Sequence, residues 1–215
     1  MQVTVSSGNN INGTLVLPLF EGVDSLPETN EGIPIALKSQ INRVLGDGDF
    51  KAKANTTMSL MGTEGGKAIL IGLGKEDKAD HHTYREAGAT IVAGHKKHHG
   101  NEMTVFFDTS DISAMASFAE GMMLRDYSYD HYKMADEDEE KAELSARMNC
   151  NEGDATVLSA AIDRAASVAS GVHLSRDLGN CPPNDMYPMA FAEKAELWAK
   201  EYDNDHTRSI LFTCD

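Results

Sequence analysis

Histidines gather in one segment of the sequence, where they could ligate a metal ion. In GHKKHHG, His95 and His99 have i,i+4 spacing, so on a helix they would share one face, and His98 stands beside them. A catalytic zinc helix of this spacing carries a glutamate directly after its first histidine, but Lys96 and Lys97 occupy the interval here. Because two ammonium groups oppose a dication, we interpret the segment as a solvated helix end, where cations suit the helix dipole.

A glycine-rich turn is the second candidate site. Ile71 to Lys75 (IGLGK) follows an apolar run and could be taken for a phosphate-binding loop. A P-loop needs four residues between its glycines and a Ser or Thr after the lysine, but Gly72 and Gly74 are too close and Glu76 follows the lysine. A dinucleotide fingerprint would need a third glycine where Asp77 stands. A tight turn from strand to helix is the favoured interpretation.

Nucleophilic catalysis is the third possibility. Cys150, Cys181 and Cys214 are widely spaced, form no CxxC pair, and Cys150 and Cys181 have no histidine close by in sequence. The chain has no G-x-S-x-G segment. An odd number of scattered cysteines favours reduced thiols in the cytosol over disulfides. We therefore expect no catalytic, cofactor-binding or metal-binding residue in this chain.

Composition narrows the partners. The 215 residues are 41% hydrophobic and 25% charged, as in globular proteins with a core, and the net charge is -15. Nucleic acid is an improbable partner for so acidic a chain, since such binding draws on cations that neutralise phosphates. No apolar run approaches the roughly 20 residues of a membrane span. The N-terminus lacks a basic patch followed by an apolar stretch, so no signal peptide is expected and we expect a cytoplasmic protein.

Short apolar runs alternate with helical patterns through the first half, which is typical of α/β folds. Strands are predicted for 3–5, 13–20, 56–61, 68–72 and 103–107, and helices for 33–45, 78–97 and 112–125. The five acidic residues at 136–140 favour an exposed loop over a cation site. The alternating AELSARM that follows could be an edge strand.

The last third of the chain predicts a long helix, a stiff connector and a second helix. An apolar stripe runs along about five turns, at Leu158, Ala161, Ile162, Ala165, Val168, Ala169 and Val172. The adjacent Pro182 and Pro183 end this helix near 178–180, with Gly179 suited to its C-terminal cap. Pro188 suits the first position of the next helix.

That second helix should place Phe191, Ala195, Trp198 and Tyr202 on one face. Residues 209–214 (SILFTC) then read as a strand directly before the end of the sequence. A terminal strand needs a partner for its backbone, so we expect the sequence to be cut within a larger fold.

Several segments, taken in order, resemble the leucyl aminopeptidase family of two-domain metallo-exopeptidases. They are GTLVLPLFEG (13–22), GDFKAK (48–53), LIGLGK (70–75), FAEGMMLRDYSYDHYK (118–133) and LSRDLGNCPPNDMYPMAFAEKA (174–195). Tyr187 stands where the family usually has threonine, and Ser175 where alanine is common. The family holds two divalent metals with N-T-D-A-E-G-R and G-x-D-M-K segments of its second domain, and neither occurs here. NEGD (151–154) and NDMY (184–187) lack the required neighbours.

The resemblance implies an α/β fold with a macrodomain-like mixed sheet flanked by helices, a long linker helix and an incomplete start of a catalytic domain. The corresponding ranges are 1–152, 153–180 and 181–215. The chain alone should be inactive, and the full-length parent should carry two divalent metals, zinc or manganese, act on peptides and assemble as a hexamer. The expected partners are the missing catalytic domain and further copies of the chain, not nucleic acid or membrane. The alternative is a free-standing module that binds a nucleotide such as ADP-ribose through the glycines of 62–66 and 72–74.

Overall fold

The chain folds into two compact units, Met1–Ser170 and Gly171–Asp215. The structure, a computed structural model, describes residues 1–8, 10–26, 32–62, 66–95, 101–133 and 143–201. The acidic run at 136–140 and the expected strand at 209–214 lie outside the described residues. The helical part of the described chain offers no segment long and apolar enough to cross a membrane.

A six-stranded mixed sheet forms the centre of the first unit, in the order β1-β6-β5-β2-β4-β3. All neighbouring strands are parallel except β3 and β4, which are antiparallel. The strands are β1 (Gln2–Ser7), β2 (Thr14–Phe20), β3 (Thr57–Met61), β4 (Lys67–Gly74), β5 (Glu102–Phe106) and β6 (Ser145–Cys150). The expected mixed α/β sheet is confirmed, with each predicted strand of the first half present.

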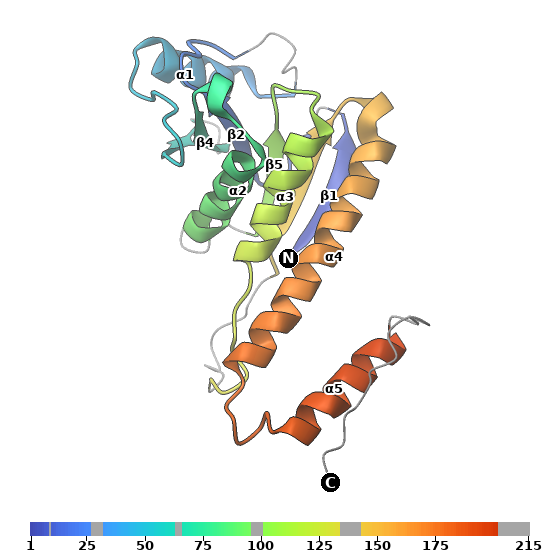
Figure 1. Ribbon diagram of the computed structural model, residues 1–215. Helices are drawn as coiled ribbons and strands as arrows, with labels where there is room; N and C mark the ends of the chain where they lie inside the picture. The colour runs from blue at the N-terminus through green and yellow to red at the C-terminus, as the bar shows by residue number, and fades with distance from the viewer. Residues whose placement is uncertain (9, 27–31, 63–65, 96–100, 134–142, 202–215) are drawn as a thin grey trace. The chain divides into compact units, whose positions relative to one another are not determined.

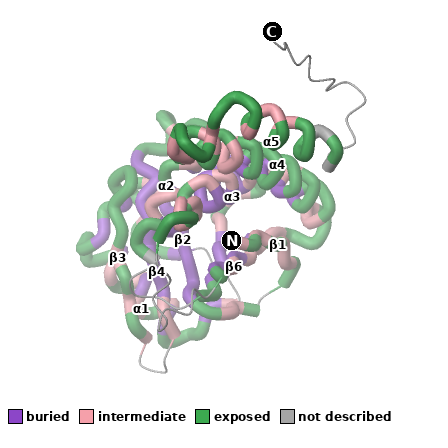
Figure 2. The backbone as a smooth tube through the Cα atoms, turned by 90° about the horizontal axis from the view of Figure 1, so that it is seen from below, coloured by how far each residue is buried: buried purple, intermediate pink, exposed green. Residues whose placement is uncertain are grey.

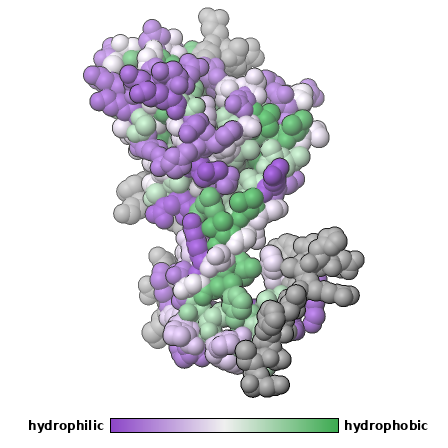
Figure 3. All heavy atoms as spheres, viewed as in Figure 1, coloured by the Kyte–Doolittle hydropathy of each residue, from purple (hydrophilic) through white to green (hydrophobic). Residues whose placement is uncertain are grey.

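Helices cover both faces of this sheet. On one face packs α1 (Ile35–Gly46); on the other lie α2 (His81–His95), α3 (Ile112–Arg125) and the part of α4 (Ala155–Asn180) that belongs to the first unit (Figure 1). The 3-10 turns η1 (Glu76–Lys78) and η2 (Glu152–Asp154) precede α2 and α4. Polar side chains gather on the outer surface over α1 (Figure 3).

Alternation along the central strands builds two cores. In β2, Val16 faces the α2–α3 side, whereas its neighbours Leu15 and Leu17 face α1. In β4, Ile69 and Leu70 divide in the same way. Because both faces are covered, these strands read as continuous apolar runs, and they are the buried centre of the fold (Figure 2).

Helices α2 and α3 approach each other closely through two glycines. A Cβ on Gly88 would overlap the carbonyl oxygen of Phe118, and one on Gly121 would overlap the carbonyl oxygen of Arg85. Beside this contact, Arg85 Nη2 donates to Oε2 of Glu120 at 3.2 Å, and the two side chains form an ion pair in which Nε lies 3.2 Å from Oε1. This charge-assisted contact links the two helices.

The interpretation of 142–148 as a possible edge strand was wrong. β6 lies between β5 and β1, and the N-terminal strand occupies the edge instead. Alternating burial along β6 does not distinguish an interior position from an edge, since strand order depends on contacts distant in sequence.

The long helix ends where the prolines require it, but without the expected glycine cap. α4 runs through Asn180, and Gly179 lies within the helix without a positive φ. The backbone N–H of Cys181 continues the ladder by donating to the carbonyl of Asp177. In the second unit, α5 (Pro188–Glu201) begins at the predicted proline.

Candidate functional site

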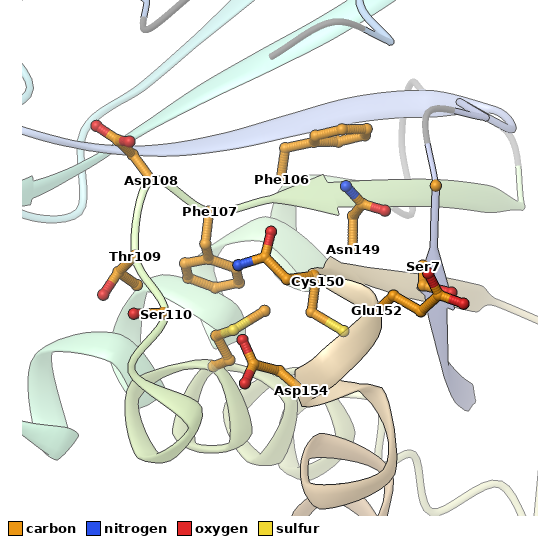
Figure 4. Close-up of a pocket in the computed structure, with 13 residues that line it drawn as sticks. Ser7, Phe106, Phe107, Asp108, Thr109, Ser110, Asn149, Cys150, Glu152 and Asp154 are labelled. Carbon is orange, nitrogen blue, oxygen red and sulfur yellow. The ribbon is translucent and has the colours of Figure 1, made fainter. Parts of the chain in front are cut away.

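A cavity of about 860 Å³ opens where three parallel strands end (Figure 4). β1, β5 and β6 run in the same direction, and their last residues, Ser7, Phe106 and Cys150, all line it. In α/β proteins this carboxyl edge of a parallel sheet is the usual place for a ligand. Its volume lies in the ordinary range of small-molecule pockets, roughly 300–1,000 Å³.

Carboxylates dominate the charge of the cavity. Asp108 follows β5 directly, and Glu152 and Asp154 lie in η2 after β6. No lysine, arginine or histidine is found among the lining residues that the structure describes. The apolar part of the lining comes from Phe106, Phe107 and Met115. The site is therefore built to disfavour anions.

Asn149 joins two of the strands that frame the cavity. With its amide turned so that the nitrogen faces carbonyl groups, Asn149 donates to the backbone oxygens of Gly8 at 2.7 Å and Ser6 at 3.1 Å. These bonds hold the end of β1 against the end of β6, so the rim of the cavity is part of the sheet rather than a free loop.

Burial, with a smaller effect of neighbouring carboxylates, raises the pKa of two groups that line the cavity. Burial, reinforced by the charge of Glu76, raises the pKa of the Asp108 carboxyl above its usual value. Burial, with a further contribution from Asp154, raises the pKa of the Cys150 thiol. Cys150 therefore stays protonated at neutral pH and is a poor nucleophile.

The pH dependence of Cys150 alkylation should reveal the raised pKa of its thiol. We expect the pH midpoint of its reaction with iodoacetamide to lie above that of free cysteine, about 8.5, and to move down in Asp154→Asn, because removing a negative charge favours the thiolate. Peptide mapping by mass spectrometry would separate Cys150 from Cys181 and Cys214. An unchanged midpoint in Asp154→Asn, or an equal shift in the exposed control Asp163→Asn, would contradict the assignment.

The glycines of the IGLGK segment have a structural role and pair with a neighbouring segment of the chain. The N–H of Gly72 donates to the carbonyl of Thr56 at 2.9 Å, and the N–H of Gly74 donates to the carbonyl of Ala52 at 3.0 Å. A Cβ on Gly72 would overlap the backbone at Lys53. These N–H groups are committed to the neighbouring segment, and that of Gly62 is likewise bonded to the carbonyl of Gly66 at 2.7 Å. They are therefore not available to cradle a phosphate.

The histidine cluster cannot be assembled into a site from the described residues. α2 ends at His95, and His98 and His99 lie outside the described part of the chain. In the described ranges no three His, Cys, Asp or Glu side chains are arranged to hold a metal ion. The described residues do not fit a resident metal, and no chemical step is assigned to one in this chain.

Comparison with known proteins shows the family to which the chain is related. Residues 16–136 match the model of the "Cytosol aminopeptidase family, N-terminal domain". The chain belongs to the cytosol aminopeptidase family. It is 31% identical over 212 residues to a probable cytosol aminopeptidase of Rhizobium etli, covering 94% of this chain and 41% of the relative. The corresponding protein of Agrobacterium fabrum is 32% identical over 197 residues, covering 85% of this chain and 37% of the relative.

Solved structures share the fold. A tomato leucine aminopeptidase mutant superposes with a TM-score of 0.71 at 20% identity, covering 94% of this chain and 43% of that chain. The bottromycin maturation enzyme BotP, in complex with Mn, superposes with a TM-score of 0.64 at 19% identity over 89% of this chain and 37% of that chain. The chain thus spans about two fifths of the length of these family members and structural neighbours. These findings favour the N-terminal domain of the family over the free-standing nucleotide-binding module.

Two short segments of the sequence have a physical role in the fold. In FAEG, Glu120 binds Arg85 and Gly121 permits the close approach of α2 and α3. In NEGD, which lacks the neighbours of the family's metal-binding segments, Glu152 and Asp154 line the cavity. Sequence reasoning missed this site, although polar residues directly after two predicted strands were a usable signal.

Proposed function

We propose that this chain is the N-terminal, non-catalytic part of a metallo-exopeptidase that removes amino-terminal residues from peptides, and that it serves assembly and access to the active site. The observation that carries this is the family match over 16–136, together with relatives more than twice as long. Residues 1–152 would form the accessory domain, 153–180 the linker helix, and 181–215 the start of the catalytic part.

The surface of α5 supports a larger folded unit. Phe191 is 50% exposed and Leu197 66% exposed, and Met189, two residues before Phe191, is 63% exposed. A run of large apolar side chains at the surface marks an interaction site in a native protein. We propose that the remaining part of the parent enzyme covers these side chains. Peptide hydrolysis by the parent would depend on two divalent metals, zinc or manganese, held by residues beyond this chain.

A chimera tests the role. This chain would replace the matching N-terminal 41% of the Rhizobium etli relative, and hydrolysis of leucine p-nitroanilide with added Mn²⁺ would be measured with the subunit number from light scattering. We expect an active hexamer, with activity within about tenfold of the unmodified relative, since that chain already shares the fold. The 215-residue chain alone should show no turnover above a protein-free blank.

The controls separate the two halves of the proposal. The relative without its N-terminal portion should lose assembly, because the accessory domain would then be missing. A soluble chimera that neither assembles nor hydrolyses the substrate would argue against the assembly role. Turnover by the isolated chain would overturn the assignment of catalysis to the other part.

A further inference from the structure

An Asn-Gly pair lies in the connection from β1 to β2, where its backbone is held by β5. Asn12-Gly13 is the single pair of this kind in the sequence. The N–H of Asn12 donates to Oγ1 of Thr104 at 3.0 Å, and this hydroxyl donates to the carbonyl oxygen of Asn12 at 2.9 Å. An Asn-Gly pair is chemically labile, because glycine has no side chain to keep its nitrogen away from the neighbouring amide carbon.

The fold requires the glycine of this pair. Gly13 has a φ of 71°, and a Cβ there would overlap the carbonyl oxygen of Glu102. Gly13 is also exposed, and none of the hydrogen bonds found in the described part of the chain uses its N–H. Its nitrogen therefore has no hydrogen bond to lose when it reacts, and a larger residue would not fit in its place.

A guanidinium group contacts the amide carbonyl with which this nitrogen would react. With the Asn12 amide turned so that its oxygen faces Arg147, Oδ1 accepts hydrogen bonds from Nη1 at 2.6 Å and from Nη2 at 3.0 Å. Arg147 lies in β6, is half-buried, and forms no ion pair within the described ranges. Two charged donors on one carbonyl oxygen stabilise the negative charge that develops there during nucleophilic attack on Cγ.

We propose that Asn12 is a site of spontaneous deamidation, which Arg147 promotes and directs toward aspartate. The nitrogen of Gly13 loses its proton and bonds to Cγ of Asn12; the bond from Cγ to Nδ2 then breaks, ammonia leaves, and a succinimide ring is closed. Water adds to Cγ, the bond between Cγ and the Gly13 nitrogen breaks, and that nitrogen recovers a proton. The product is an aspartate whose carboxylate pairs with Arg147, a stronger contact than that of the neutral amide.

Arg147 also selects between two products of the ring. Water that adds to the backbone carbon instead of Cγ gives isoaspartate, in which the side-chain methylene becomes part of the main chain. The guanidinium group contacts the oxygen on Cγ, whereas the backbone oxygen of Asn12 accepts only from the neutral hydroxyl of Thr104 in the described chain. Because the charged donors activate Cγ more strongly, the folded chain should yield mainly aspartate.

The test is to age the full 215-residue chain for several weeks at mildly basic pH, folded in one sample and unfolded in guanidinium chloride in another. Peptide mapping would detect the mass increase of about 1 Da at Asn12, and electron-transfer fragmentation would separate aspartate from isoaspartate. We expect conversion in both samples, with mainly aspartate in the folded chain and a mixture with a larger share of isoaspartate in the unfolded chain.

Matched variants decide whether Arg147 is responsible. Arg147→Met removes both donors and should slow the conversion in the folded chain by about tenfold or more, the scale of losing a donor to a developing oxyanion. Arg147→Lys keeps one cationic donor and should give an intermediate rate. Arg164→Met removes the same charge from an exposed position of α4 and should leave the rate unchanged. In guanidinium chloride all four chains should react alike, because the contact is then absent.

A variant that carries the product provides a second measurement if the Arg147 variants do not fold. Asn12→Asp should raise the urea midpoint of the chain at low salt, since the new carboxylate pairs with Arg147. Asn55→Asp is the matched control: Asn55 donates to Oε2 of Glu86 at 3.1 Å, so the same added charge should lower the midpoint there.

The proposal is overturned by any of four results. They are an unmodified Asn12 in the folded chain when the unfolded chain has been converted; an isoaspartate share as large in the folded chain as in the unfolded one; a rate in the folded chain that Arg147→Met leaves unchanged or raises; or a lower urea midpoint in Asn12→Asp.

Discussion

Gly121→Ala should lower the free energy of unfolding by about 3 kcal/mol or more, at the upper end of what overpacking costs. The added methyl group would lie 1.9 Å from the Arg85 carbonyl oxygen, so α2 and α3 must move apart. Backbone is the obstacle here, not the flexible end of a side chain, and the shift would also lengthen the ion pair between Arg85 and Glu120. Urea denaturation followed by circular dichroism would measure the loss.

The same interface and the same helices supply the controls. Gly88→Ala should act like Gly121→Ala, because its Cβ would overlap the carbonyl oxygen of Phe118. Gly94, near the end of α2, has open space around it, so Gly94→Ala should be neutral or stabilising by up to about 1 kcal/mol. The double variant Gly88→Ala/Gly121→Ala should cost less than the sum of the two, since one separation of the helices relieves both overlaps. A small loss in Gly121→Ala, equal to the effect in Gly94→Ala, would refute the close packing.

Local patterns predicted the elements well because each carries its own signal. The N-terminus of α3 illustrates this: Asp111 accepts hydrogen bonds from the N–H groups of Ser113 and Ala114, and the helix spans the predicted 112–125. Helix α1 began two residues later than predicted, since Pro34 serves as its N-cap. Such features depend on neighbours in the sequence.

Features that depend on distant contacts were not predictable. The interior position of β6 requires β1 to pair with it from the far end of the unit. The cavity exists only because β1, β5 and β6 end together, which no segment reveals alone. The glycines of α2 and α3 read as ordinary helix-weakening residues until the two helices are placed side by side.

The predicted apolar stripe on α4 is only partly buried. Leu158, Ile162, Ala165 and Ala169 are buried as predicted, whereas Val168 is 48% exposed. The buried face is therefore narrower than the apolar stripe, because one row of side chains at i, i+4 is enough to meet the sheet. An exposed valine at this position is ordinary on a protein surface and indicates no site by itself.

Because the buried face of α4 is narrow, few side chains hold the helix against the core. Leu158→Ala should therefore destabilise the chain strongly. Leu158 is 0% exposed in the α2–α3 core, so its truncation removes apolar burial and leaves a cavity. We expect a loss of about 2–5 kcal/mol in the free energy of unfolding, measured by urea denaturation of the whole chain. Ile162→Ala, one turn further and 3% exposed, should behave alike.

Val157→Ala is the matched control, because Val157 is adjacent in sequence but 60% exposed. It should change stability by no more than about 0.5 kcal/mol, as surface substitutions usually do. If α4 were held by helix propensity instead of by packing, Val157→Ala would stabilise the chain and Leu158→Ala would be nearly neutral, since alanine is the better helix former in both cases. A large loss in Leu158→Ala beside an unchanged Val157→Ala would show that one buried row of side chains anchors α4 to the sheet.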